Sequence, residues 1–270
     1  MMHNINTVLK SSKTSLGKTF HYAKKVGSGV TAVGEGFYVV YKNQLYKSPN
    51  KPENTKYVQW FCRKMCQVFN VDIQIHGEQR KDHTVALWAS NHISWLDIPV
   101  LGASARIFFL AKAEIEQWPI LGKLAKGGGT LFIKRGSGDS AKIKDQITAF
   151  LKQDVPVLFF PEATTSDGTY IQRIHGRLFA AAIEAQKPVQ LVLLCYVNQE
   201  GKLDQVTPYI GDASLVKHVK NVVDMPKVTA HVAFLPEIDV KGHTVETLTK
   251  TVQVAMKEGL LHLHQKVLSK

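Results

Sequence analysis

The sequence predicts an α/β fold: a central, largely parallel or mixed sheet flanked by helices, with a helical, amphipathic extension at the N-terminus. Apolar, strand-like segments alternate with helical patterns from about residue 85 to the C-terminus, which is typical of layered α/β domains. The chain of 270 residues is long enough to bury a substantial core. Residues 1–54 are basic, rich in Gly and Ser, and weakly periodic. We therefore expect a basic N-terminal extension at 1–54 and one α/β domain at 55–270.

The elements follow from local periodicity. A Pro-containing turn at residues 48–52 closes the extension. Apolar residues at helical spacing predict a helix at 57–69, which either packs on the core or lies at a membrane interface. Buried apolar runs predict strands at 85–89, 106–110, 130–134, 155–160, 189–197 and 228–235. Amphipathic patterns predict helices at 140–152, 177–186 and 244–268.

Charge and composition restrict the surroundings and the partners. The formal net charge is +12, which favours a polyanionic partner, either nucleic acid or an anionic lipid surface. The sequence contains no recognised nucleic-acid-binding motif, so we expect an anionic membrane surface and no nucleic acid. No apolar run reaches the roughly 18 residues that span a bilayer, and no signal peptide is evident. Three cysteines suit a reducing compartment. The expected location is the cytoplasm, peripheral on the membrane.

A histidine and an aspartate follow the first predicted strand of the domain. His92 and Asp97 lie five positions apart where the strand gives way to a helix, for which Ser94 is the expected N-cap. The bend can return the carboxylate to the imidazole. An aspartate bonded to one ring nitrogen fixes the tautomer and leaves the other nitrogen as a base. By itself the spacing also suits a structural histidine. With its context, it predicts a general base.

Two further strands end in residues suited to ligand binding. Gly129 precedes a strand that ends at Lys134 and Arg135, two cations that can hold a phosphate or a carboxylate. The strand at 155–160 leads directly into Glu162 and Thr164. Parallel strands would bring all these residues to one edge of the sheet.

In this order the motifs resemble a known family. Asn91-His92-x4-Asp97, the stretch 129–135 (Gly-Thr-Leu-Phe-Ile-Lys-Arg) and the stretch 160–164 (Phe-Pro-Glu-Ala-Thr) are similar to motifs of the glycerolipid acyltransferase superfamily, which includes the lysophosphatidic acid (1-acylglycerol-3-phosphate) acyltransferases. Residues 109–112 and 118–122 also resemble the segment that these enzymes carry between their first two motifs. The resemblance covers roughly residues 85–196.

The resemblance implies an acyltransferase domain at 55–270 that moves a fatty acyl group from acyl-carrier protein or coenzyme A to the free hydroxyl of a lysolipid. It implies His92 as general base, Asp97 as its orienting partner and Arg135 at the acceptor phosphate. It implies neither a metal, nor a cofactor, nor an acyl-enzyme intermediate; the acyl thioester is a co-substrate. The residues assigned to substrate binding are Lys112, Gly129, Lys134, Arg135, Glu162 and Thr164.

The third motif departs from the family pattern at the acceptor site. It usually reads Glu-Gly-Thr-Arg, but here Thr165 replaces the arginine. Arg173, Arg177 or Lys126 could supply the missing cation. A second departure is Leu191, which stands where the fourth motif carries its second proline. The acceptor predicted first is a lysolipid such as 1-acylglycerol-3-phosphate. The alternative is lyso-ornithine lipid or another acceptor, and the remoter one is a non-catalytic lipid-binding protein of the same fold.

Overall fold

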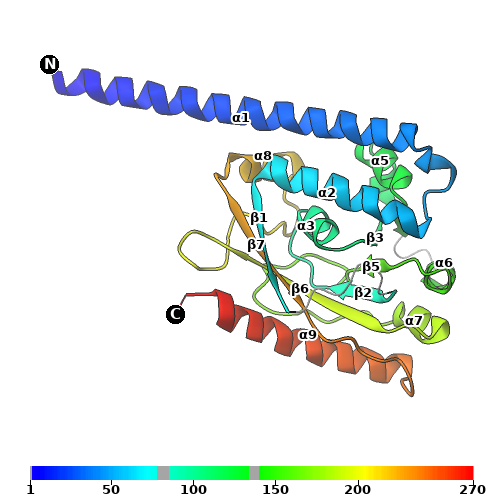
Figure 1. Cartoon of the computed structure of the whole chain (residues 1–270). Coiled ribbons are helices and arrows are strands. Elements are labelled where there is room, and N and C mark those ends of the chain that lie inside the picture. The colour runs from blue at the N-terminus through cyan, green and yellow to red at the C-terminus, as the bar shows by residue number, and fades with distance from the viewer. Residues whose placement is uncertain (1, 78–84, 134–139, 270) are drawn as a thin grey trace.

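The computed structural model describes residues 2–77, 85–133 and 140–269, and these build the α/β fold that the sequence predicts (Figure 1). One seven-stranded sheet has the order β1-β7-β6-β2-β5-β3-β4. Strands β6, β2, β5, β3 and β4 are mutually parallel, whereas β7 is antiparallel to β6 and parallel to β1. The strands are β1 (Val71–His76), β2 (Leu87–Ser90), β3 (Phe108–Lys112), β4 (Leu131–Ile133), β5 (Val157–Phe159), β6 (Val189–Val197) and β7 (Val228–Phe234).

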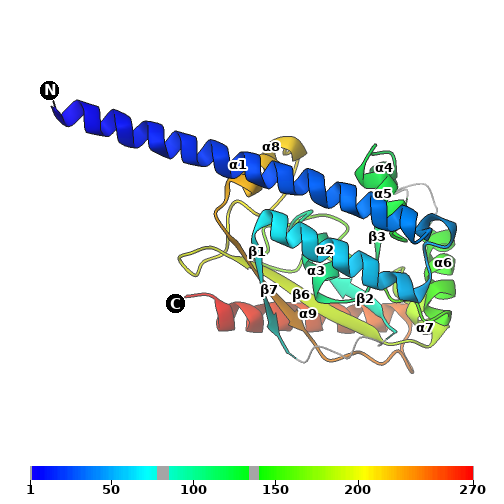
Figure 2. The same ribbon diagram turned by 45° about the horizontal axis from the view of Figure 1, so that its top comes forward.

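Helices cover both faces of the sheet (Figures 1 and 2). One apolar cluster joins the sheet to helices α2, α3 and α8, and the other joins it to α6, α7 and α9. Short helices α4 and α5 connect β3 to β4. The helices are α1 (Met2–Lys42), α2 (Thr55–Phe69), α3 (Asp97–Ser104), α4 (Ala113–Glu116), α5 (Leu121–Gly127), α6 (Ser140–Lys152), α7 (Phe179–Ala185), α8 (Leu215–Asp224) and α9 (Val245–Val267), with 3-10 turns at Leu45–Lys47 and Pro52–Asn54.

Most of the N-terminal extension is helix α1, which has 41 residues. Helix α1 runs beside α2 on the outer side of the domain, and its N-terminal end projects beyond the rest of the molecule (Figure 2). Lys25 fixes it at the far end of α8, where the Nζ atom donates to the carbonyl oxygens of Val223 at 2.8 Å and Met225 at 2.7 Å. Burial lowers the pKa of Lys25. The division of the chain at residue 54 stays a prediction.

The predicted strands that matter for the site are present. Strand β6 has the predicted bounds, and every one of its residues is buried, because both faces of this central strand are covered by helices. β6 lies on one side of β2 and β5 lies on the other. The edge strand β1 was not predicted from the sequence. It follows α2 after Asn70 ends that helix in the left-handed conformation (φ 54°).

Candidate active site

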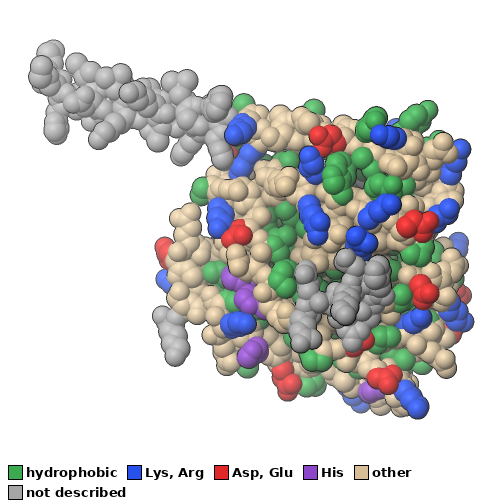
Figure 3. Space-filling model, viewed as in Figure 1, with side chains coloured by type: hydrophobic (Ala, Val, Ile, Leu, Met, Phe, Trp, Pro, Cys, Tyr) green, Lys and Arg blue, Asp and Glu red, His purple; other side chains and the backbone are tan. Residues whose placement is uncertain are grey.

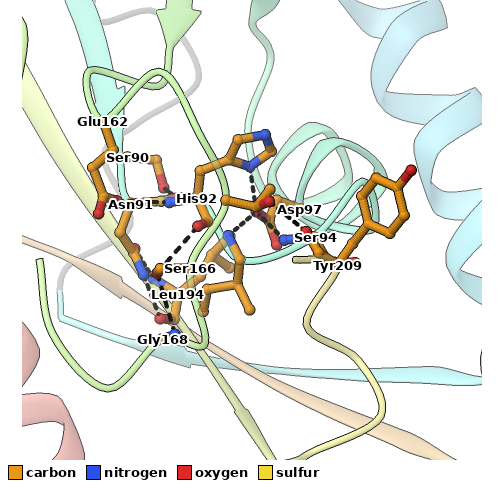
Figure 4. A network of polar contacts seen from close by, with 12 residues as sticks. Ser90, Asn91, His92, Ser94, Asp97, Glu162, Ser166, Gly168, Leu194 and Tyr209 are labelled. Carbon is orange, nitrogen blue, oxygen red and sulfur yellow. Dashed lines mark hydrogen bonds and ion pairs between the residues drawn. The ribbon is translucent and has the colours of Figure 1, made fainter. Parts of the chain in front are cut away.

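The turn after β2 carries the predicted histidine, and its shape is fixed by the neighbouring strand β6. The side-chain amide of Asn91 donates to the carbonyl of Leu194 at 3.0 Å, and its Oδ1 accepts the N–H of Leu194 at 2.7 Å. These two bonds replace the strand ladder just where β2 leaves the sheet. His92 is therefore held at the carboxyl edge of the sheet, as predicted (Figure 4).

His92 and Asp97 form the predicted pair. Nδ1 of His92 lies 2.7 Å from Oδ2 of Asp97. Because a carboxylate only accepts hydrogen bonds, Nδ1 carries the proton and Nε2 has the free lone pair of a base. Among the described residues, Nε2 has no hydrogen-bond partner, and the His92 side chain is 18% exposed. The ring of Phe160 stacks on the imidazole, with the centroids 3.9 Å apart and the planes at 14°.

Asp97 is buried and is held by more than the histidine. Oδ2 also accepts the backbone N–H groups of Ile93 at 2.7 Å and Ser94 at 2.9 Å, while Oδ1 accepts the hydroxyl of Tyr196 at 2.8 Å. The expectation that Ser94 is the N-cap was wrong, because helix α3 begins at Asp97 and its cap residue Leu96 makes no side-chain hydrogen bond. The carboxylate itself collects the N–H groups at this end of the helix (Figure 4).

Glu162 is buried and clamps the backbone of the histidine turn. Its Oε1 accepts the N–H of His92 at 3.0 Å, and its Oε2 accepts the N–H of Gln172 at 2.8 Å. Burial raises the pKa of the Glu162 carboxyl, and the two backbone N–H groups act in the opposite direction. On the other side of the turn, Ser166 N–H donates to the carbonyl of His92 at 2.9 Å. The third motif thus holds the His92 turn from both sides.

The other predicted site residues lie on different elements of the fold. Lys112 is exposed at the end of β3, and Thr164 is exposed in the loop after β5. Strand β4, which precedes Lys134 and Arg135, lies three strands from β2, or roughly 14 Å at the usual strand spacing. Lys134 and Arg135 themselves lie outside the described residues.

Gly129 has a structural explanation. Its φ is +79°, and a Cβ atom there would lie 2.5 Å from the Phe108 ring and 2.7 Å from the carbonyl oxygen of Pro49. Glycine is therefore required by the turn itself and by close packing.

At the position of the missing arginine, Thr165 donates a hydrogen bond to the carbonyl of Tyr209, and the N–H of Tyr209 donates to the carbonyl of Ile93 at 2.9 Å. The segment around Tyr209 is thereby held beside the histidine turn. Of the cations considered as substitutes, Lys126 pairs with Glu116 at 3.0 Å, whereas the side chains of Arg173 and Arg177 are exposed.

Phe160 and Tyr196 were not predicted as residues of the site. Phe160 directly follows β5 and was quoted only as part of a motif. Tyr196 was placed in a buried strand without a role. The signal for Tyr196 was its hydroxyl, since a fully buried tyrosine in an apolar strand requires a hydrogen-bond partner.

Comparisons with known proteins show the family to which the chain belongs. The protein-family model described as "Acyltransferase" matches residues 72–194. A lyso-ornithine lipid O-acyltransferase of Pseudomonas aeruginosa is 35% identical over 234 residues, which cover 86% of this chain and 90% of the relative. The chain belongs to the glycerolipid acyltransferase superfamily. A 1-acyl-sn-glycerol-3-phosphate acyltransferase of Neisseria meningitidis is 39% identical over 150 residues, 55% of this chain and 58% of the relative.

A solved structure confirms the fold of this acyltransferase. The crystal structure of PlsC, a 1-acyl-sn-glycerophosphate acyltransferase from Thermotoga maritima, superposes with a TM-score of 0.65 at 19% identity, covering 94% of this chain and 98% of the other. In the described ranges, no helix of the acyltransferase is both long and apolar enough to cross a bilayer. Nor, within those ranges, do three or more His, Cys, Asp or Glu side chains form a group that could hold a metal ion.

Proposed function

We propose that this acyltransferase moves a fatty acyl group from an acyl thioester to the free hydroxyl of lyso-ornithine lipid, with His92 as general base. The observation that carries the proposal is the pairing of His92 Nδ1 with the buried Asp97 carboxylate at 2.7 Å, which leaves Nε2 available on a partly exposed ring.

The chemistry follows from this arrangement. Nε2 removes the proton of the acceptor hydroxyl as its oxygen attacks the thioester carbonyl carbon. The imidazolium that forms is stabilised by the Asp97 carboxylate, which three further hydrogen bonds hold in place. The carbon–sulfur bond then breaks, and the proton passes from Nε2 to the departing thiolate. The donor is the thioester of acyl-carrier protein or of coenzyme A.

Two observations favour lyso-ornithine lipid as the acceptor. The relative that this chain matches over 90% of its length bears that activity in its name. In addition, Thr165 stands at the motif position where the family usually carries an arginine, and its hydroxyl is engaged with the Tyr209 carbonyl. An acceptor without a phosphate monoester does not require that arginine.

A direct assay tests the proposal. Purified enzyme is offered labelled acyl-carrier protein or acyl-coenzyme A with lyso-ornithine lipid or 1-acylglycerol-3-phosphate, and the products are identified by mass spectrometry. We expect diacylated ornithine lipid as the main product, and a fall of roughly 10²–10⁴-fold in His92→Ala. The exposed His262 supplies a matched control, and His262→Ala should keep full activity. Equal inertness of wild type and His92→Ala toward both acceptors would instead favour a lipid-binding protein without catalysis.

The second candidate acceptor is 1-acylglycerol-3-phosphate. It is favoured by the 39% identity to the Neisseria meningitidis enzyme over 150 residues. The same assay separates the two candidates. If phosphatidate is the main product, 1-acylglycerol-3-phosphate replaces lyso-ornithine lipid as the proposed acceptor.

We further propose that the enzyme works while attached to the surface of an anionic membrane. Lysine and arginine side chains are spread over the face formed by α1 and α2, with hydrophobic side chains between them (Figure 3). Among the side chains of α1 that the structure describes, the large exposed apolar ones are Tyr22, Val26, Val30, Tyr38 and Tyr41. Basic and aromatic side chains together suit an anionic interface. Vesicle flotation tests this: the protein should float with vesicles that contain anionic lipid and much less with neutral ones. A protein that stays at the bottom in both cases does not bind this way.

A further inference from the structure

The buried hydroxyl of Tyr196 lies against the carboxylate that orients His92. Tyr196 belongs to β6, which is adjacent to β2, and its side chain is 2% exposed. Its hydroxyl donates to Oδ1 of Asp97 at 2.8 Å, on the oxygen opposite the one that faces the histidine. The three side chains are thus hydrogen-bonded to one another in the order Tyr196, Asp97, His92, although Tyr196 and His92 are about a hundred positions apart in sequence.

The direction of this hydrogen bond is fixed. Burial, and then the neighbouring Asp97 carboxylate, raise the pKa of the Tyr196 hydroxyl well above its usual value, so the phenol keeps its proton and donates it. The other titratable groups around the pair are His92, Glu162, Cys66 and Cys195. Burial raises the pKa of the Cys66 and Cys195 thiols to about 12, so both are neutral at physiological pH.

We infer that Tyr196 is a positioning residue of the acyl transfer, which acts on His92 through Asp97. The inference rests on the proposed function and adds a third member to the His92–Asp97 pair. The hydroxyl does two things. It fixes the rotation of the carboxylate, so that Oδ2 lies in line with Nδ1. It also draws part of the negative charge to Oδ1, which limits how tightly the carboxylate holds a protonated imidazole and keeps His92 able to give up its proton.

Tyr196→Phe removes only the hydroxyl from an apolar site. Without it, more of the Asp97 charge faces His92, and the imidazolium is held more tightly. We therefore expect kcat/KM at pH 7 to fall roughly tenfold and the acidic limb of the kcat/KM profile to move to higher pH. A purely structural role would lower the melting temperature and leave the limb in place. Tyr57→Phe is the matched control, since the Tyr57 hydroxyl donates to Asn43 at 2.9 Å and not to the His92–Asp97 pair. It should change neither kcat/KM nor the position of the acidic limb.

A second readout does not require turnover. The proton on Nδ1 of His92, assigned by its loss in His92→Gln, should shift downfield in Tyr196→Phe, because the bond to Asp97 strengthens. If wild type transfers no acyl group to any acceptor, the proposed function fails, and this resonance still decides the role of Tyr196. If the acidic limb of the kcat/KM profile and the Nδ1 proton resonance of His92 both stay at their wild-type positions in Tyr196→Phe, the inference is overturned.

Site-specific 3-fluorotyrosine at position 196 gives the opposite change and covers the case in which Tyr196→Phe does not fold. Fluorine makes the phenol a stronger donor at nearly unchanged volume. The acidic limb should then move to lower pH and the Nδ1 proton upfield. If the acidic limb or the Nδ1 proton moved in the same direction as in Tyr196→Phe, Tyr196 would not act on His92 through the charge of Asp97.

Discussion

The hydroxyl of Thr165 donates a hydrogen bond to the carbonyl oxygen of Tyr209, and Thr165 stands at the motif position where the family pattern has an arginine. Thr165→Arg should raise the use of 1-acylglycerol-3-phosphate relative to lyso-ornithine lipid by about tenfold or more, the value of one charge-assisted contact. Competition between the two acceptors in one reaction measures the ratio. Thr165→Val, which removes the hydroxyl without adding charge, should reduce stability by about 1 kcal/mol and leave the ratio unchanged. An unchanged ratio in the arginine variant would mean that position 165 does not meet the acceptor headgroup.

Asp97→Asn should abolish most of the transfer. The asparagine oxygen can still accept from His92 and the two backbone N–H groups, but its NH2 group then faces Tyr196, whose hydroxyl must change from donor to acceptor. The negative charge that stabilises the imidazolium is also lost. We expect kcat to fall roughly 10²–10⁴-fold, as measured by steady-state kinetics on protein of verified fold. Asp239→Asn, at an exposed turn, is the control and should be fully active. More than a tenth of wild-type kcat in Asp97→Asn would exclude the assigned role.

Ala163→Gly should stabilise the protein. Ala163 has φ 59° in the third motif, a left-handed conformation that costs an alanine about 1–2 kcal/mol, and the family usually has glycine there. After allowing for the greater freedom of glycine in the unfolded chain, we expect a gain of about 0.5–1 kcal/mol in the free energy of unfolding, measured in urea. Ala149→Gly on the exposed face of α6 is a control of opposite sign and should lose about 1 kcal/mol. A loss in both variants would show that residue 163 is not held in this conformation.

Stability should decrease in mild acid because of two histidines on neighbouring strands. Nε2 of His76 lies 2.9 Å from Nδ1 of His231, and burial is the main cause that lowers the pKa of both imidazoles. Above pH 6.5 the rings are neutral in the folded and the unfolded chain. As the pH falls below 6.5, the two imidazoles bind protons in the unfolded chain but stay neutral in the folded protein, so the free energy of unfolding decreases. Urea midpoints at pH 7.5 and 5.5 measure the change.

In His231→Gln this decrease should be smaller, because one of the two groups is gone. His262→Gln removes an exposed histidine and should reproduce the wild-type decrease. If His231→Gln lost as much stability as the wild type between the two pH values, the pair would not be responsible.

Much of the sheet could be predicted because its central strands are apolar on both faces. The bounds of β6 and of helix α6 were predicted without error, since a long buried run and a regular amphipathic pattern leave little choice. Strand β1 was missed because it is a half-exposed edge strand without the continuous apolar run of the central strands, and it follows a helix without a glycine or proline turn.

In the site, sequence spacing was enough to pair His92 with Asp97, since only five positions separate them and the bend closes on itself. The contact of Tyr196 with Asp97 could not be predicted in this way. It depends on the register between β6 and β2, which is set by tertiary pairing and not by any local signal. The clamp by Glu162 was missed for a related reason: its partners are backbone N–H groups, which no residue pattern reveals.

The pairing of β1 with β7 also affects how the protein folds. Val71 lies opposite Val228, so the strand synthesised first forms its backbone pairs with the strand synthesised last. Contacts of such high sequence separation are slow to form, because a long loop must close before they yield any stabilisation. A nascent chain that emerges through β6 can already assemble the histidine turn and its carboxylate, yet its first strand still lacks a neighbour. Ribosome-bound intermediates of this enzyme should therefore expose an unpaired strand edge until residue 234 has left the exit tunnel.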